Sequence, residues 1–227
     1  AIIGEPTSMR VVNAHKGKLS MRAHFHGLEC HSSLAPQGVN AVEFAARLIV
    51  MLSDFGQRKS REGPFDRAYD VPFTTAHTGT VEGGTALNIV PKDCTFDFEF
   101  RYLPMEDPQA LLREVVDYAH QQLLPQMRSV FPEAAIEFEE ISAFSGLNIP
   151  DDHEIVQLAK ALTGANSTTK VAFGTEAGLI SDAGIPSVVC GPGDIAQAHK
   201  PDEFISLEQL ALCEAFMNRL CERIAGD

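Results

Sequence analysis

Three phenylalanines, Phe96, Phe98 and Phe100, alternate with polar residues through the segment 93–101. Successive side chains of a β-strand point to opposite faces, so this pattern predicts a strand with one apolar and one wet face. Arg101 belongs to the wet face and points away from the phenylalanines. The segment therefore predicts a sheet that is covered on one side only.

Further strands and two helices are predicted around this segment. Residues 16–18 are predicted as the turn of a hairpin that joins the strands 9–13 and 19–25. One helix is predicted to start after Asn40, a plausible N-cap, and to end in the loop 57–64. The other predicted elements are strands at 74–81 and 135–141 and a helix at 108–127. This order resembles a ferredoxin-like sandwich, with two helices on one face of an antiparallel sheet.

From about residue 142 the sequence pattern changes to alternating helices and strands. Helices are predicted at 152–163 and 176–182, strands at 170–173 and 187–190, and a last helix behind the capping box 206–209. Alternation of this kind is typical of a mostly parallel sheet. The fold class predicted is α/β, with an inserted ferredoxin-like α+β domain over 11–142. Residues 1–10 and 143–227 are predicted to form the α/β layer.

Composition narrows the range of partners. With 227 residues and a formal net charge of -13, the chain has too few clustered cations to favour nucleic acid or an anionic membrane. Its five cysteines show no CxxC spacing, which favours a reducing cytoplasm over a disulfide framework or a zinc knuckle. No apolar run is long enough to span a bilayer.

Cys30 and His31 first suggest a thiol nucleophile beside its base. Adjacent residues of a strand point to opposite faces, however, so the two side chains are poorly placed to pair. A buried cysteine next to a surface histidine is the plainer interpretation.

Glu5 and His199 suggest a different chemistry. Glu5 follows the strand-like start of the chain, and His199 lies in a loop between a predicted strand and a capped helix. Ligands gather at the carboxyl ends of strands in open α/β sheets, and a carboxylate with an imidazole suits zinc. Taken singly, each residue is as well explained as a solvated loop residue.

Together the motifs resemble the co-catalytic zinc amidohydrolases, a family that includes aminoacylases, desuccinylases, carboxypeptidase G and acetylornithine deacetylase. The motifs, in chain order, are GEPT at 4–7, HKGK at 15–18, CHSSLAP at 30–36, GVNA at 38–41, NIVP at 88–91, FR at 100–101, FGTEAG at 173–178 and CGPG at 190–193, followed by His199. They run through the whole chain.

The resemblance implies roles for individual residues. Glu5 and His199 would each ligate one of two zinc ions, for which cobalt is an alternative. His31 would stabilise the oxyanion in the active site of a second copy of the chain. Asn88, Arg101, Gly174 and Thr175 would contact the substrate, and Arg101 suits a carboxylate because its donors form a planar fork. If Glu176 faces the pocket, it would favour a substrate with an ammonium group, as in N-acetylornithine; otherwise it is an acid in the first turn of a helix.

The activity implied is removal of an acyl group from an N-acyl amino acid, with N-acetylornithine in arginine biosynthesis as the first expectation and an aminoacylase or a desuccinylase as the alternative. The family also requires upstream His, Asp and Glu residues that are not found here. Glu139 and Glu140, the one Glu-Glu pair in the sequence, are predicted to be a solvated strand end. We therefore expect this chain to be the C-terminal part of a homodimeric enzyme and to be inactive alone, or else to be a non-catalytic dimerisation module.

Overall fold

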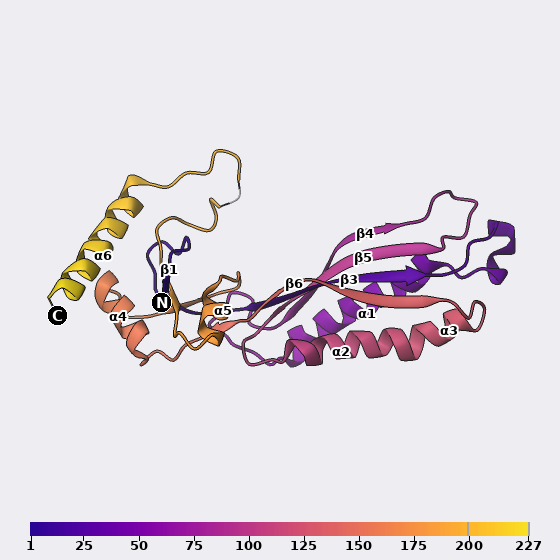
Figure 1. Cartoon of the computed structure of the whole chain (residues 1–227), viewed down its shortest axis with the longest axis horizontal. Helices are drawn as coiled ribbons and strands as arrows, with labels where there is room; N and C mark the ends of the chain where they lie inside the picture. The colour runs from indigo at the N-terminus through magenta and orange to yellow at the C-terminus, as the bar shows by residue number, and fades with distance from the viewer. Residues whose placement is uncertain (199, 227) are drawn as a thin grey trace. The chain divides into compact units, whose positions relative to one another are not determined.

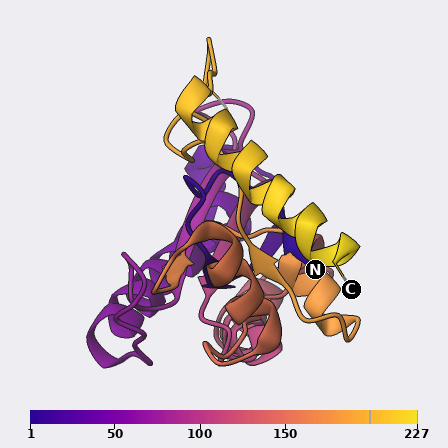
Figure 2. The same ribbon diagram turned by 90° about the vertical axis from the view of Figure 1, so that its left-hand side faces the viewer.

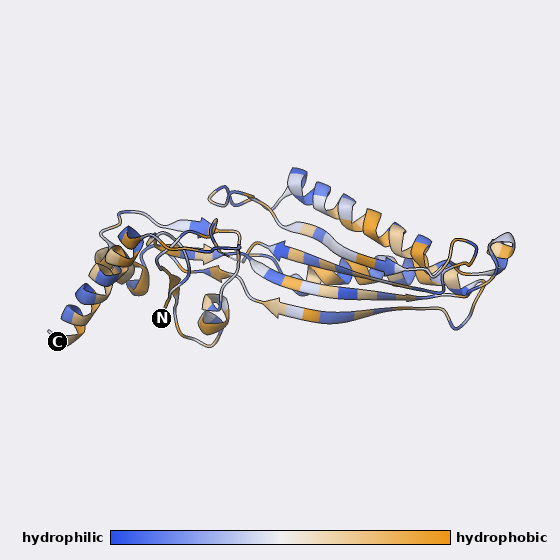
Figure 3. Cartoon of the chain, turned by 90° about the horizontal axis from the view of Figure 1, so that it is seen from above, coloured by the Kyte–Doolittle hydropathy of each residue, from blue (hydrophilic) through white to orange (hydrophobic). Residues whose placement is uncertain are grey.

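The phenylalanine segment forms strand β5, Asp93–Tyr102, in the computed structural model, which describes residues 1–198 and 200–226. Phe96, Phe98 and Phe100 are buried, as the alternation predicts. The same alternation of hydropathy is visible along the strands of this sheet in Figure 3. The sheet has the order β4-β5-β3-β6, and the other strands are β3 at Gly17–His26, β4 at Thr75–Gly83 and β6 at Ala135–Phe144.

Two helical segments share one core with this sheet. The first is α1, Ala41–Glu62. The Glu43 amide in its first turn donates to Asn40 Oδ1, which confirms Asn40 as the N-cap. The second consists of α2 at Pro108–Tyr118, a π-helical turn at Ala119–Leu123 and α3 at Leu124–Arg128. Pro125 has no N–H and its ring clashes with the preceding turn, which explains the wider turn there. Apolar residues of β3, β5, β6 and both helical segments form a single buried cluster, so both helices cover the same face.

A second, mixed sheet is built from five short strands. They are β1 at Ile2–Ile3, β2 at Val12–His15, β7 at Leu147–Asn148, β8 at Thr169–Val171 and β9 at Val188–Val189. The first strand, β1, lies next to the N-terminus (Figure 1). The pairs β1–β9 and β2–β8 are parallel, as expected from the alternating pattern, whereas β2 is antiparallel to both β7 and β9. The second sheet is therefore mixed.

Three helices accompany this sheet, namely α4 at Glu154–Thr163, α5 at Ala177–Asp182 and α6 at Leu207–Ala225. Val156 and Ala159 of α4 share a core with Val188 and Val189 of β9. On α6, Phe216 packs in a smaller cluster with Leu162 and Cys190, and Figure 2 shows α6 running past the N-terminus. The predicted cap of α6 is present, since the Gln209 amide donates to Ser206 Oγ.

The chain divides into two compact units. Unit 1 comprises Ala1–Gly17, Asp66–Pro72 and Phe144–Asp227, and unit 2 comprises Lys18–Phe65 and Phe73–Ala143. Residues 11–17, which the sequence assigned to the inserted domain, thus lie in unit 1. So does the short loop Asp66–Pro72, which interrupts unit 2 between α1 and β4.

The predicted hairpin at 16–18 is wrong. Strand β2 pairs with β7, β8 and β9, whereas β3 pairs with β5 and β6, so the two strands belong to different sheets. Lys16, which was predicted to lie in the turn, is almost fully buried, and so is its neighbour His15. The segment is extended because it continues from one sheet into the other.

The acid pair Glu139 and Glu140 is exposed, as expected, but it lies inside β6 rather than at the end of the strand. Glu139 Oε2 lies 3.3 Å from His24 Nε2.

None of the helices formed by residues 1–198 and 200–226 has the length and apolar character needed to cross a membrane.

Candidate functional site

The loops that follow β1 and β9 lie against each other at the carboxyl ends of these parallel strands. Thr7 and Asp194 form an isolated antiparallel bridge, and the Gly191 amide donates to Thr7 Oγ1 at 3.1 Å. A Cβ atom at Gly191 would lie 2.5 Å from the Glu5 carbonyl oxygen, so only glycine allows this approach. The loop with Glu5 and the loop that leads to His199 are therefore adjacent, as predicted, although His199 itself lies outside the described residues.

The Glu5 loop is strained and tightly held. Ser8 and Met9 have φ angles of 54° and 59°, in the left-handed region that residues other than glycine seldom adopt. Their amides donate to the Gly193 and Gly191 carbonyl oxygens at 2.7 and 2.8 Å. Left-handed residues of this kind cost about 1–3 kcal/mol each and cluster at functional sites, where the surrounding structure must fix them.

The segment with Gly174, Thr175 and Glu176 connects β8 to α5. A Cβ atom at Gly174 would overlap the Phe144 ring at 1.7 Å, so the glycine is needed for packing. Thr175 is buried, and its Oγ1 accepts from the Ala177 amide at 3.1 Å, which caps α5. Glu176 is exposed at the N-cap position and makes no side-chain cap of its own.

His31 is positioned by backbone bonds from both sides in unit 2. The Ser32 amide donates to the Asn88 carbonyl oxygen at 2.9 Å, and His31 bridges Ile89. The Ser33 amide donates to His31 Nδ1 at 3.2 Å. Because Nδ1 accepts this bond, the proton of the neutral ring is on Nε2. The exposed side of His31 thus carries a hydrogen-bond donor.

Cys30 and His31 do not form a nucleophile and base pair. The Cys30 thiol donates to the Leu34 carbonyl oxygen at 3.4 Å, and the side-chain bond of His31 goes to Ser33. His31 is exposed, as the plainer interpretation expects, but Cys30 is only partly buried.

Arg101 and Asn88 lie at opposite ends of β5. Asn88 precedes the strand, and Arg101 is its second last residue, roughly 25 Å along the strand from Asp93 at about 3.3 Å per residue. Arg101 is one-third exposed, and its Nε donates to Glu99 Oε1 at 2.8 Å. Unit 2 thus brings His31 and Asn88 together but separates them from Arg101.

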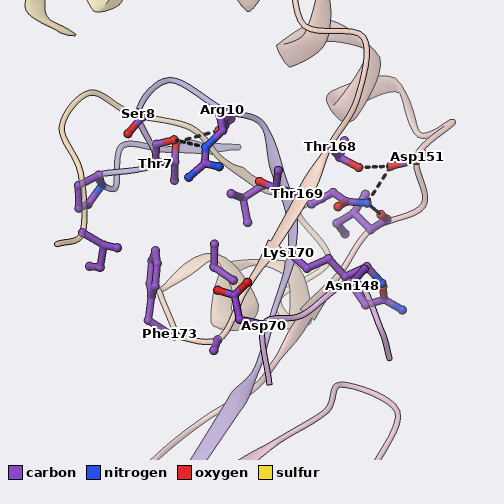
Figure 4. A pocket seen from close by; sticks show the side chains of 18 of the residues that line it. Thr7, Ser8, Arg10, Asp70, Asn148, Asp151, Thr168, Thr169, Lys170 and Phe173 are labelled. Carbon is purple, nitrogen blue, oxygen red and sulfur yellow. Dashed lines mark hydrogen bonds between the residues drawn. The ribbon is translucent and has the colours of Figure 1, made fainter. Parts of the chain in front are cut away.

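A cavity of about 800 Å³ opens in unit 1 beside the Glu5 loop and the segment that leads to Gly174 (Figure 4). Pro6, Thr7 and Arg10 contribute to one part of its wall, and Phe173 to another. Asp70, from the loop Asp66–Pro72, also lines it. Sequence reasoning missed Arg10 and Asp70, because neither has a periodic pattern around it; the signal for Arg10 was its nearness to the GEPT motif.

A carboxylate and an imidazole, as at Glu5 and His199, are donors that zinc accepts. Within residues 1–198 and 200–226, no group of three or more His, Cys, Asp or Glu side chains is placed to hold a metal ion. The described part of the chain thus provides Glu5 as a donor of the right kind but no complete site.

Burial shifts the pKa of three other side chains, His15, Cys94 and Cys190. It lowers the pKa of His15, against an opposing hydrogen bond between Nδ1 and the Lys16 carbonyl oxygen. It also raises the pKa of the Cys94 thiol, and raises that of Cys190 to about 11. Raised pKa values keep these two thiols protonated at neutral pH, which disfavours them as nucleophiles.

Residues 13–127 match the model of the family described as the peptidase dimerisation domain. The chain belongs to this family. The match includes all of α1, β3, β4 and β5, together with His31, Asn88 and Arg101.

The chain is also similar to acetylornithine deacetylases over its whole length, which confirms the resemblance inferred from the motifs. It is 32% identical to that of Myxococcus xanthus over 226 residues, which are 100% of this chain and 58% of the relative. It is 35% identical to that of Proteus mirabilis, over 98% of this chain and 55% of the relative. The chain thus spans little more than half the length of these relatives.

Solved structures agree on the fold. An aminopeptidase PepT from Bacillus cereus matches 98% of this chain, and the chain covers 56% of it, with a TM-score of 0.73 and 23% identity. A tripeptidase from Staphylococcus aureus matches 99% of this chain, with 56% of its own length covered, a TM-score of 0.71 and 22% identity.

Proposed function

We propose that this chain is part of a metal-dependent amidohydrolase that removes an acyl group from an N-acyl amino acid, with N-acetylornithine as its substrate. The observation that carries the proposal is the similarity to acetylornithine deacetylases across both units. The adjacent loops that contain Glu5 and lead to His199 support it. Because the chain spans only part of its relatives, the activity proposed is that of the full-length protein.

Glu5 and His199 are the residues proposed to hold the metal, with zinc first and cobalt as the alternative. A bound metal would supply a water of lowered pKa and would polarise the amide carbonyl group. The Glu5 backbone is fixed for this role, since the Thr7 amide donates to its carbonyl oxygen at 2.8 Å and Gly191 packs against it.

His31 is proposed to stabilise the negative charge that develops on the amide oxygen. Its Nε2–H is a fixed donor, because Nδ1 is held by the Ser33 amide. Removal of one such donor typically costs about 3–4 kcal/mol of transition-state stabilisation, or about 100-fold or more in rate.

The separation of Arg101 from His31 and Asn88 supports a homodimer. A small acyl amino acid cannot touch both ends of β5 in one protomer. If the substrate contacts all three side chains, then Arg101 comes from one protomer and His31 with Asn88 from its partner. Arg101 would bind the substrate carboxylate, and the Gly174 and Thr175 segment would contact the substrate beside the metal-binding loop.

Glu176 is proposed to favour a substrate with a side-chain ammonium group. It is exposed at the start of α5, directly after Thr175, so its carboxylate is available to a ligand. A Glu176→Gln variant would then lose its preference for N-acetylornithine over an acyl amino acid with a neutral side chain.

The dimer proposal is tested by mixing two impaired variants of the full-length protein. We expect Glu5→Ala to abolish the release of ornithine from N-acetylornithine and His31→Ala to slow it about 100-fold or more. After subunit exchange, a mixed dimer has one site with intact Glu5 and a partner's intact His31, so activity should return to about a quarter of the wild-type level.

Two results would count against the proposal. No recovery in mixtures that have been shown to contain mixed dimers would exclude His31 acting across the dimer. Release of ornithine by the 227-residue chain alone would show that the rest of the relatives' length is not needed for activity.

A further inference from the structure

Five charged side chains line the cavity of unit 1, namely Arg10, Lys170, Asp70, Asp151 and Asp194. Lys170, Asp151 and Asp194 each bond to another side chain, whereas Arg10 and Asp70 bond to no other side chain among the described residues. Arg10 lies before β2, and Asp70 lies in the loop Asp66–Pro72. Figure 4 shows Arg10 beside Thr7 and Asp70 beside Phe173, on different parts of the wall. Opposite charges on separate walls of one cavity match a ligand that itself has two opposite charges.

The strained loop positions Arg10. Its Nε donates to the Thr7 carbonyl oxygen at 3.3 Å, and the Thr7 hydroxyl donates to the Arg10 carbonyl oxygen at 2.8 Å. The left-handed residues Ser8 and Met9 turn the chain so that both bonds form. Within the described ranges, the Nη atoms of Arg10 make no further hydrogen bond or ion pair, so they are available to a carboxylate in the cavity.

The loop of Asp70 is anchored without using Asp70. Tyr69 is 3% exposed, and Asp66 accepts from Lys170 Nζ at 2.7 Å. Lys170 also lines the cavity, but its charge is compensated by Asp66 and does not neutralise Asp70. Across the residues that the structure describes, Asp70 makes no hydrogen bond or ion pair.

A third polar group in the wall is buried and incompletely bonded. Asn13 is 5% exposed, and its Nδ2 donates to the Ile149 carbonyl oxygen at 2.8 Å and to Asp151 Oδ1 at 3.0 Å. Its Oδ1 has no hydrogen-bond partner among the described residues. A buried acceptor without a partner costs about 1–3 kcal/mol, which a donor on a ligand would recover.

We propose that this cavity binds a small zwitterion, with its carboxylate at Arg10 and its ammonium group at Asp70. Phe173 and Pro6 supply apolar surface for the hydrocarbon between the two charges. Arg101 and Glu176 are proposed above to bind the two charges of N-acetylornithine, so this cavity is a second site, for a zwitterion of similar length. The cavity itself requires only the two charges.

The experiment compares three five-carbon probes that carry both charges or one of them. Binding of 5-aminopentanoate, pentanoate and pentylammonium to the 227-residue chain is measured by titration with NMR detection of the amides of residues 7–13 and 168–173. Arg10→Gln should weaken 5-aminopentanoate and pentanoate about tenfold and leave pentylammonium unchanged. Asp70→Asn should weaken 5-aminopentanoate and pentylammonium and leave pentanoate unchanged.

Arg113→Gln and Asp117→Asn, two exposed positions on α2 of unit 2, are the matched controls and should leave all three affinities unchanged. Circular dichroism establishes that each variant is folded. The proposal is overturned if 5-aminopentanoate shifts no cavity amide, or if its affinity is the same in the wild type and in both cavity variants.

The probes contain no amide, so this result is independent of hydrolysis. Charge-dependent binding in a full-length protein that does not hydrolyse N-acetylornithine would overturn the proposed function and leave the zwitterion site standing. Hydrolysis of N-acetylornithine by a protein that does not bind 5-aminopentanoate in this cavity would overturn the zwitterion site and leave the proposed function standing.

Discussion

The Lys170 ammonium group donates to the Asp66 carboxylate over 2.7 Å, although 104 residues separate them in the sequence. Both side chains are less than a quarter exposed, and the Lys170 ammonium lies 5.6 Å from the centre of the Tyr69 ring. The pair holds the loop Asp66–Pro72 against β8. Burial opposes ionisation of Asp66, but its hydrogen bonds, first that from Lys170, lower its pKa below the usual value.

Lys170→Met should therefore destabilise the chain. The variant keeps the length of the side chain but leaves Asp66 without its cation, at a cost of about 1–2 kcal/mol in the free energy of unfolding. Urea denaturation at pH 7 measures this cost. Because the folded pKa of Asp66 is lowered, the difference should be present above about pH 4 and shrink as the pH falls further. Lys92→Met, at an exposed pair with Glu29 of 3.9 Å, is the control, and an equal loss there would contradict the argument.

The buried His15, a base rather than an acid, should also make the stability of the chain depend on pH. Burial lowers its folded pKa, so the unfolded chain binds a proton more readily below about pH 6.5. The free energy of unfolding should then decrease as the pH falls from 6.5 to the folded pKa, by at most about 1.4 kcal/mol per pH unit. A His15→Gln variant should lack this component, whereas exposed His77→Gln should retain it. The prediction fails if the difference in stability between wild type and His15→Gln does not change with pH.

His15 and His31 should be opposite tautomers. His31 Nδ1 accepts from the Ser33 amide, which leaves the proton on Nε2, whereas His15 Nδ1 lies 2.9 Å from the Lys16 carbonyl oxygen and must donate to it. Long-range ¹⁵N–¹H correlation at about pH 8, where neutral rings dominate, distinguishes the two forms directly. His120, whose Nε2 lies 3.1 Å from the Ile136 carbonyl oxygen, serves as the reference for an Nε2–H ring. If His31 is protonated on Nδ1, its proposed donor role is lost.

Patterns within one element predicted unit 2 well. The alternation around Phe98 and the N-cap at Asn40 depend on neighbouring residues only, so the sequence is enough to place β5 and α1. The hairpin at 16–18 was wrong because strand pairing depends on distant segments. Nothing near Gly17 shows that β2 pairs with β8, which lies more than a hundred residues away.

In the candidate site, too, local patterns were predicted and contacts between distant segments were not. Glu5 and the loop to His199 were predicted to meet, since both follow strands that the sequence identifies. Arg10 and Asp70 were not predicted, because they share a cavity only through the return of the loop Asp66–Pro72 to unit 1. That return depends on the packing of Tyr69 and the pairing of Asp66 with Lys170, neither of which has a local pattern.

Gly178 should tolerate no larger side chain, although it lies in helix α5. Alanine is favoured over glycine in a helix by about 1 kcal/mol. A Cβ atom at Gly178, however, would lie 2.2 Å from the Ser145 carbonyl oxygen and 3.3 Å from His15 Cε1. Since the first contact is with backbone, the overpacking cost of about 1–3 kcal/mol should outweigh the helix propensity. Gly178→Ala is therefore expected to lower the midpoint of urea unfolding, whereas Gly4→Ala, with open space around its Cβ position, should change it little. A Gly178→Ala chain as stable as the wild type would mean that the segment 144–146 can move away from α5 without cost.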